Sequence, residues 1–115
     1  MKKTAAALDA WQREYDRLRK GLAQIGYISQ GSVLDRSRLR PPRSGYQWTR
    51  KVAGKTITVA LTGQQFAALS QAVANERNLW KTIRKMESLS RRILFENQPH
   101  THRRKRLSNK VLGLV

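Results

Sequence analysis

The fold is decided by residues 46–61, whose sequence is YQWTRKVAGKTITVAL. Aromatic and β-branched residues dominate both arms of this stretch, and Ala53-Gly54 joins the arms. Such residues favour strands, and glycine supplies the positive φ that a two-residue turn needs. The stretch therefore predicts a β-hairpin with strands over Tyr46–Val52 and Lys55–Leu61. Because an isolated hairpin is marginal in water, its apolar face must lie on a helix or meet a third strand.

The residues after the hairpin predict a long helix. Thr62 and Gln65 have the spacing of a capping box, and the pattern then stays helical to about Glu96. Such a run is roughly 50 Å long at 1.5 Å per residue, so the hairpin alone cannot cover it. One broad face of this helix carries Phe66, Leu69, Val73, Trp80, Ile83, Met86, Ser90, Ile93 and Leu94.

A second helix is expected at the N-terminus, over Thr4–Ala23. Its apolar residues are spaced alternately three and four apart, which is typical of a narrow helical stripe. They are Leu8, Trp11, Tyr15, Leu18, Leu22 and Ile25. We expect this stripe to pack antiparallel along the distal half of the long helix, near Leu79, Ile83, Met86 and Ile93. Contact within one chain is favoured over an intermolecular zipper, because three heptads are the lower limit for a coiled coil.

The segment between the first helix and the hairpin is rich in glycine, serine and arginine. No helix crosses Pro41-Pro42, and a short strand is expected within Tyr27–Leu34. On an extended chain Arg36, Arg38 and Arg40 would point to one side. The sequence thus predicts an α+β fold: helix, basic loop, hairpin with or without a third short strand, and a long helix paired with the first. Residues 1–97 are expected to form one small domain, and residues 98–115 a basic, flexible tail.

Charge is the dominant feature of the composition. The 115 residues include 24 Lys and Arg against 7 Asp and Glu, a formal net charge of +17. Residues 27–61 hold seven basic and one acidic side chain, and residues 98–115 hold five and none. Self-repulsion of this size opposes compaction, so we expect a polyanionic partner.

Several classes of protein are excluded by composition. There is no cysteine, which excludes disulfides, thiol catalysis and cysteine-based zinc sites. No run of about 18 apolar residues exists to form a membrane-spanning helix, and no membrane partner is expected. The N-terminus begins like a signal peptide but becomes charged before an apolar core forms, so we expect no export and a cytoplasmic location.

No catalytic constellation is apparent in the sequence. The acids are scattered along the helices beside bases, and Asp35 is expected to cap a turn or pair with a neighbouring arginine. His100 and His102 lie in the basic tail, where positive neighbours repel a cation. We therefore expect no catalytic residue, no metal, no cofactor and no enzyme activity.

Nucleic acid is the expected ligand. Guanidinium groups bind phosphate or guanine in a bidentate manner, and a two-stranded ribbon fits a major groove about 12 Å wide. We expect the aromatic residues of the hairpin to be core and the surrounding bases to be contacts. The candidate residues are Arg36, Arg38, Arg40, Arg43, Arg50, Lys51, Lys55, Arg103, Arg104, Lys105 and Arg106.

DNA is favoured over RNA, and two alternatives stay open. One is an RNA-binding or ribosome-associated basic protein. The other is a protein-interaction module whose helix pair docks on an acidic partner or forms a homodimer.

Four stretches also suggest a family: IGYISQGSV, RPPRSGYQW, VAGKTITVAL and ANERNLWKTIRKME. From Leu22 to Glu96 they resemble a small bacterial family of unknown function, encoded beside mobile-element genes such as transposases. The resemblance implies a DNA-binding accessory of a mobile element. Related sequences often carry a cysteine-containing stretch before the hairpin, where this chain has none, so no metal role carries over. The order of hairpin and helix is also similar to the arm-binding domains of phage integrases, by analogy of fold alone.

Overall fold

The computed structural model describes residues 5–97 and 107–114 of an α+β protein. The elements follow the order α1 (Ala5–Gly21), η1 (Leu22–Gln24), β1 (Ser32–Asp35), η2 (Arg36–Arg38), β2 (Tyr46–Val52), β3 (Lys55–Leu61), α2 (Gly63–Asn97) and α3 (Asn109–Leu112). The chain forms two compact units: a helical unit, Met1–Gln24 with Trp80–Val115, and a sheet unit, Ile25–Leu79. Helix α2 contributes residues to both units.

The sheet unit contains an antiparallel sheet with the strand order β1–β2–β3. Trp48 in the central strand lies opposite Val33 on one side and Val59 on the other. Pairing of Val52 with Lys55 leaves Ala53 and Gly54 as the turn, with φ values of 49° and 79°. A two-residue turn with positive φ at both residues matches the right-handed twist of the two strands that it joins. The predicted hairpin is confirmed, and the third strand is Ser32–Asp35.

Helix α2 begins with the predicted capping box. The Thr62 amide donates to Oε1 of Gln65 at 2.9 Å, and the Gln65 amide donates to Oγ1 of Thr62 at 3.1 Å. One turn further, the ring of Phe66 stacks on the ring of Tyr46, with centroids 4.4 Å apart and planes at 23°. This stacked pair joins the apolar face of β2 to the start of α2.

The segment before β1 crosses α2 within the sheet unit. The Ser29 amide donates to the Ala72 carbonyl at 3.1 Å, and the Asn75 side-chain amide donates to the Tyr27 carbonyl at 2.9 Å. Ala72 and Val73 are the buried residues of this unit among those described. The small side chain of Ala72 is suited to this close approach of two backbones.

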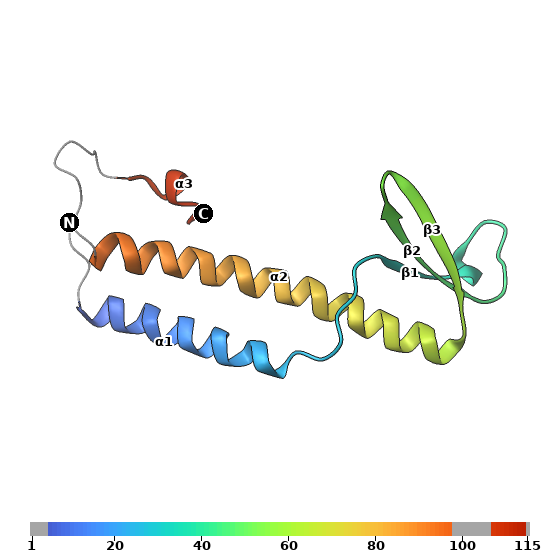
Figure 1. Ribbon diagram of the computed structural model, residues 1–115, viewed down its shortest axis with the longest axis horizontal. Coiled ribbons are helices and arrows are strands. Elements are labelled where there is room, and N and C mark those ends of the chain that lie inside the picture. The colour runs from blue at the N-terminus through green and yellow to red at the C-terminus, as the bar shows by residue number, and fades with distance from the viewer. Residues whose placement is uncertain (1–4, 98–106, 115) are drawn as a thin grey trace. The chain divides into compact units, whose positions relative to one another are not determined.

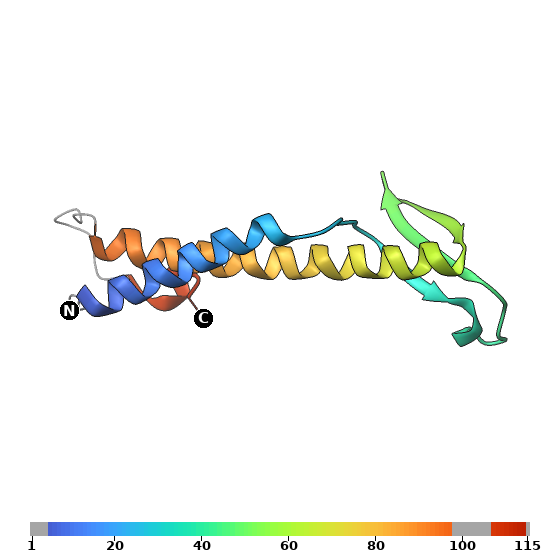
Figure 2. The ribbon, with the colours of Figure 1, turned by 90° about the horizontal axis from the view of Figure 1, so that it is seen from below.

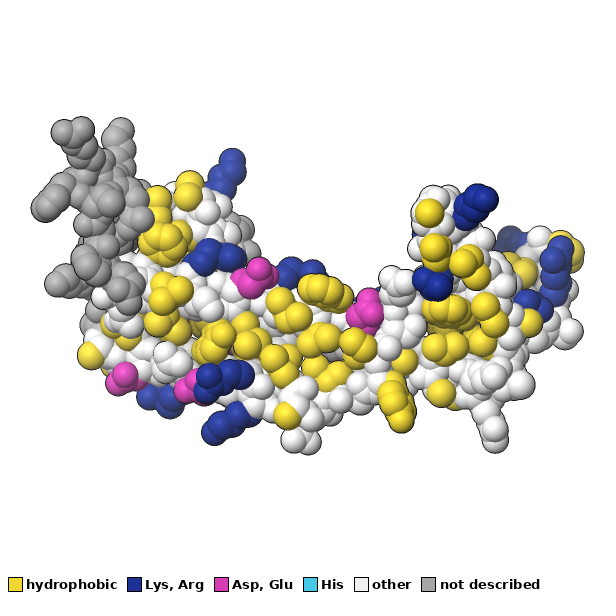
Figure 3. All heavy atoms as spheres, viewed as in Figure 1, with side chains coloured by type: hydrophobic (Ala, Val, Ile, Leu, Met, Phe, Trp, Pro, Cys, Tyr) yellow, Lys and Arg dark blue, Asp and Glu magenta, His cyan; other side chains and the backbone are white. Residues whose placement is uncertain are grey.

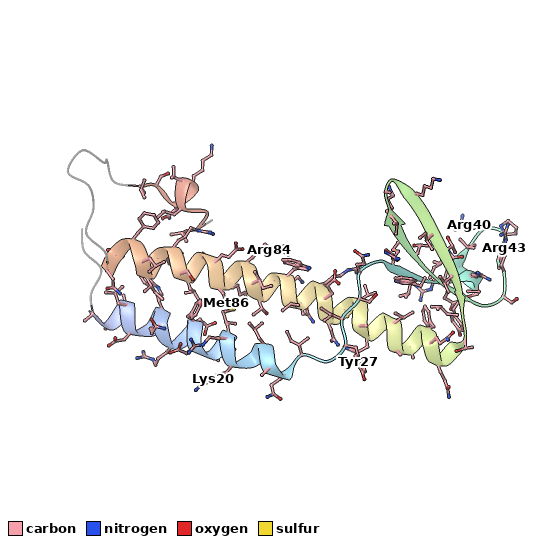
Figure 4. All side chains as sticks on the ribbon, in the orientation of Figure 1. Lys20, Tyr27, Arg40, Arg43, Arg84 and Met86 are labelled. Carbon is pink, nitrogen blue, oxygen red and sulfur yellow. The ribbon has the colours of Figure 1, made fainter. Side chains whose placement is uncertain are left out.

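In the helical unit, α1 lies antiparallel to the second half of α2, as both views of the ribbon show (Figures 1 and 2). Leu18 is buried, and Met86 lies on the side of α2 that faces α1 (Figure 4). The guanidinium of Arg92 lies 5.5 Å from the ring centroid of Trp11. The predicted helix pair is confirmed, although α1 ends at Gly21, where a single 3₁₀ turn follows.

A short helix, α3, follows in the C-terminal segment, where the sequence predicted no regular structure. Ser108 caps it, and Gly113 ends it with a left-handed φ of 69°. A guanidinium nitrogen of Arg91 donates to the Gly113 carbonyl at 3.5 Å. The flexibility expected for residues 98–106 lies outside the described residues. None of the described helices has a stretch long and apolar enough to span a lipid bilayer.

Candidate nucleic-acid interface

The loop between β1 and β2 has a defined backbone shape built around Arg36. The Arg36 amide donates to the Gly45 carbonyl at 2.9 Å, which extends the pairing of the two strands beyond Asp35. The Arg36 carbonyl in turn accepts from the amides of Leu39 and Arg43, at 3.1 and 3.0 Å. These backbone hydrogen bonds fold the loop back on itself.

The expectation that Arg36, Arg38 and Arg40 point to one side of an extended chain is wrong. Arg36–Arg38 form a 3₁₀ turn, so the two-residue alternation of a strand is lost. The cause is Asp35, whose Oδ1 accepts from the Ser37 amide at 3.0 Å and from the Ser37 hydroxyl at 2.7 Å. Aspartate side chains commonly redirect the backbone in this way at a turn. The capping role expected for Asp35 is confirmed.

The four loop arginines do not share one environment. Arg36 is half-buried, and its Nε donates to Oε1 of Gln47 in β2 at 3.2 Å, so its side chain is held against the sheet. Arg38, Arg40 and Arg43 are exposed, and Figure 4 shows the last two on the outer part of the loop. The loop therefore presents three free guanidinium groups on a backbone that a fourth arginine anchors.

These three guanidinium groups form no ion pair with the described acids. Two ion pairs, Glu14–Arg17 and Asp16–Arg19, both lie on α1 and involve none of these arginines. Hydrogen bonds from the Ser37 hydroxyl and then the Ser37 amide lower the pKa of Asp35, with a smaller contribution from the charge of Arg38. Asp35 is therefore ionised at neutral pH, and its Oδ1 accepts hydrogen bonds from Ser37. Arg40 and Arg43 form no ion pair with any described acid.

Asp35→Ala is expected to lower the free energy of unfolding at neutral pH, because the 3₁₀ turn loses its cap. The folded state depresses the carboxyl pKa below its usual 3.8. Its stabilisation is therefore present above pH 3.8 and is lost as the pH falls through the lowered pKa. Urea unfolding of both proteins between pH 7 and pH 2 should show the stability difference shrinking at acid pH. Asp35→Asn is the control because it keeps an acceptor without the titration, and a pH-independent difference would contradict the prediction.

The hairpin cations divide between the two faces of the sheet. Arg50 lies on the same face as Trp48, with its guanidinium 5.8 Å from the Trp48 ring centroid. Val52, two residues after Arg50, lies on this face as well, and its directly paired partner Lys55 shares the face. Lys51 lies on the opposite face because side chains alternate along a strand. On the face seen in Figure 3, hydrophobic side chains over the strands are bordered by Lys and Arg. The structure therefore places Arg50 and Lys55 on one face of the sheet and Lys51 on the other.

The aromatic residues of the hairpin pack as expected of a core. Tyr46 stacks on Phe66, and the indole Nε1 of half-buried Trp48 donates to the Gln30 carbonyl at 3.0 Å. The predicted basic tail, Arg103, Arg104, Lys105 and Arg106, lies outside the described residues. No group of three or more His, Asp or Glu among the described residues is placed to hold a metal ion.

Helix α2 carries a second group of cations, which was not among the residues predicted from the sequence. Lys81, Arg84 and Lys85 are exposed and share one face by their spacing of three and four residues. Trp80, expected on the apolar face, is instead half exposed. The spacing of Lys81, Arg84 and Lys85 is a signal that the sequence contains. Glu76 and Glu87 lie on either side of the three cations in the sequence and partly cancel their charge in the net charge of the segment.

Comparison of the chain with protein-family models, with curated proteins and with solved structures finds no match.

Proposed function

We propose that this protein is a non-catalytic nucleic-acid-binding protein whose β1–β2 loop binds the phosphate backbone. The observation that carries the proposal is the trio Arg38, Arg40 and Arg43, which is exposed and has no carboxylate partner among the described residues. Guanidinium groups bind phosphate oxygens in a bidentate manner, and such contacts supply most of the non-specific affinity for nucleic acid.

Two further features support phosphate binding at this loop. The hydrogen bonds to Arg36 order the backbone before any ligand arrives, which lowers the entropic cost of binding. The sheet unit is also strongly basic, with eight Lys and Arg against two Asp and Glu in residues 25–79. An uncompensated charge of this sign attracts polyanions and speeds association.

Duplex DNA is the form of nucleic acid that the sheet unit suits best. Beyond Thr49, where β1 no longer pairs with β2, the hairpin is a two-stranded ribbon of the kind that fits the major groove. Arg50 and Lys55 add two cations to one face of this ribbon. A role as accessory of a mobile element rests on the sequence resemblance alone.

The test is the triple variant Arg38→Gln, Arg40→Gln, Arg43→Gln. Each phosphate contact contributes about −0.9 to the slope of log affinity against log salt on duplex DNA, so the slope should become shallower by about 2 to 3. Fluorescence anisotropy with labelled duplex DNA, single-stranded DNA and structured RNA at several salt concentrations measures it. The matched control, Arg13→Gln, Lys20→Gln, Lys110→Gln, removes three exposed cations of the helical unit and should leave the slope unchanged.

An unchanged slope in the loop variant would remove this loop from the mechanism. Tighter binding to structured RNA than to duplex DNA at equal salt would make RNA the ligand.

One observation favours a second candidate, a protein-interaction module. The outer edge of β3 pairs with no other described strand, and Ile57 and Val59 on its apolar face are 39% and 42% exposed. An open edge of this kind is a template for strand addition by another chain. A wild-type protein without salt-sensitive affinity for any of the three nucleic acids would favour this candidate.

A further inference from the structure

The three tryptophans of the chain have different environments. Trp11 and Trp48 are half-buried, and each lies under an arginine, Arg92 and Arg50 respectively. Trp80 is 50% exposed, and its indole makes no hydrogen bond and no ring contact with any described residue. Exposure of half an indole leaves a large apolar surface in water, with a free N–H at its edge.

The residues next to Trp80 on α2 are basic. Lys81, Arg84 and Lys85 follow it at one, four and five residues, and all three are exposed. Arg84 lies on the side of α2 opposite to Met86, away from α1 (Figure 4). The indole, four residues before Arg84, therefore lies at the border of a group of exposed cations.

Acids of α2 border these cations without forming an ion pair with them: Glu76 lies four residues before Trp80, and Glu87 lies three residues after Arg84. Glu87 is the nearest acid along α2, and the described residues show no ion pair between it and the three cations. Glu14 on α1 has a lowered pKa mainly because of its hydrogen bond to Arg17, and Lys85 contributes as a more distant charge. Lys81 forms like-charged pairs with Arg84 and Lys85 at spacings of three and four, which destabilise an isolated helix. None of these cations forms an ion pair with a described acid, and an anionic ligand would relieve the repulsion.

We propose that Trp80, Lys81, Arg84 and Lys85 form a contact surface for an unpaired nucleic-acid strand. The indole stacks on one base, and the three cations contact phosphates next to that base. An unpaired base is required because the faces of a base within a duplex are already stacked on its neighbours. Exposed aromatic side chains beside cations are the usual means of binding single strands without sequence preference. This inference rests on the proposed nucleic-acid function and adds a ligand form that the sheet unit does not favour.

The first test is Trp80→Ala, assayed by fluorescence anisotropy with labelled oligothymidine and labelled duplex at one fixed salt concentration. Loss of one stacked base should weaken binding to oligothymidine about tenfold and change duplex binding less than twofold. Trp80→Phe keeps a stacking ring and should recover most of the affinity. Leu94→Ala is the matched control, because Leu94 is also on α2 and 53% exposed, and it should bind as the wild type does. Far-UV circular dichroism checks that each variant keeps its helix content.

The second test is the triple variant Lys81→Gln, Arg84→Gln, Lys85→Gln. Each phosphate contact on a single strand contributes about −0.7 to the salt slope, so the slope on oligothymidine should become shallower by about 2. The variant Arg13→Gln, Lys20→Gln, Lys110→Gln again serves as the control of equal charge.

Three outcomes would overturn the inference. In the first, Trp80→Ala binds oligothymidine as tightly as Leu94→Ala does. In the second, Trp80→Ala weakens binding to duplex DNA and to oligothymidine equally. In the third, Trp80→Ala changes the sedimenting mass of the free protein, which would make Trp80 a protein–protein contact. Each of these leaves the proposed function intact if the Arg38, Arg40 and Arg43 variant still shows the shallower slope on duplex DNA. Absence of salt-sensitive binding by the wild type to either probe would defeat both.

Discussion

Gly31→Ala is expected to lower the free energy of unfolding by about 3 kcal/mol or more. Gly31 has a φ of +106°, and a Cβ at this position would lie 2.5 Å from both the Thr49 carbonyl oxygen and Nε1 of Trp48. A side chain at such a φ costs about 1 to 3 kcal/mol, and forcing atoms into a filled site costs about as much again. Displacing the indole also threatens its hydrogen bond to Gln30, worth roughly 1 kcal/mol.

The control for Gly31 is Gly54→Ala in the hairpin turn. Gly54 also has a positive φ, +79°, but a Cβ at Gly54 would have no other atom within 4 Å. Only the conformational cost remains, so about 1 kcal/mol should be lost. Urea unfolding followed by tryptophan fluorescence measures both variants. Equal losses would show that the close approach of Gly31 to β2 contributes nothing.

Phe66→Ala is expected to lower the free energy of unfolding by about 2 to 3 kcal/mol. Full burial of a phenylalanine makes its truncation cost about 3 to 5 kcal/mol, and Phe66 is only half-buried. The ring stacks on Tyr46 at 4.4 Å between centroids, which is the main aromatic contact between β2 and α2. Its loss removes both the apolar contact and the preferred ring geometry.

Two further variants separate these contributions. Phe66→Leu keeps most of the apolar volume and loses the stacking, so it should cost about 1 kcal/mol. Leu94→Ala removes an exposed side chain of α2 and should change stability by less than about 0.5 kcal/mol. A Phe66→Ala loss no larger than that of Leu94→Ala would show that the sheet does not depend on this contact.

Most elements of the fold were predictable because their causes are local. The alternation of β-branched residues around Ala53-Gly54 specified a two-residue hairpin, and the spacing of Thr62 and Gln65 located the start of α2. The three-and-four spacing of apolar residues in α1 required a helical partner, which the second half of α2 provides.

The candidate site was less predictable, because one hydrogen-bonding side chain changes the path of the backbone. A run of alternate arginines is typical of an extended chain, but Asp35 accepts from Ser37 and turns the chain at Arg36–Arg38. Arg36 consequently anchors the loop through Gln47, whereas Arg38 stays exposed with the later arginines.

The sequence by itself determined the two main helices, the hairpin, the order of these elements and the large excess of positive charge, since each depends on residue type and spacing along the chain. Only the tertiary structure decided which cations lack a carboxylate partner and which tryptophan keeps an exposed face. It also placed the backbone of Gly31 against β2 and that of Ser29 against Ala72. These properties depend on distances between residues remote in sequence, which no local pattern specifies.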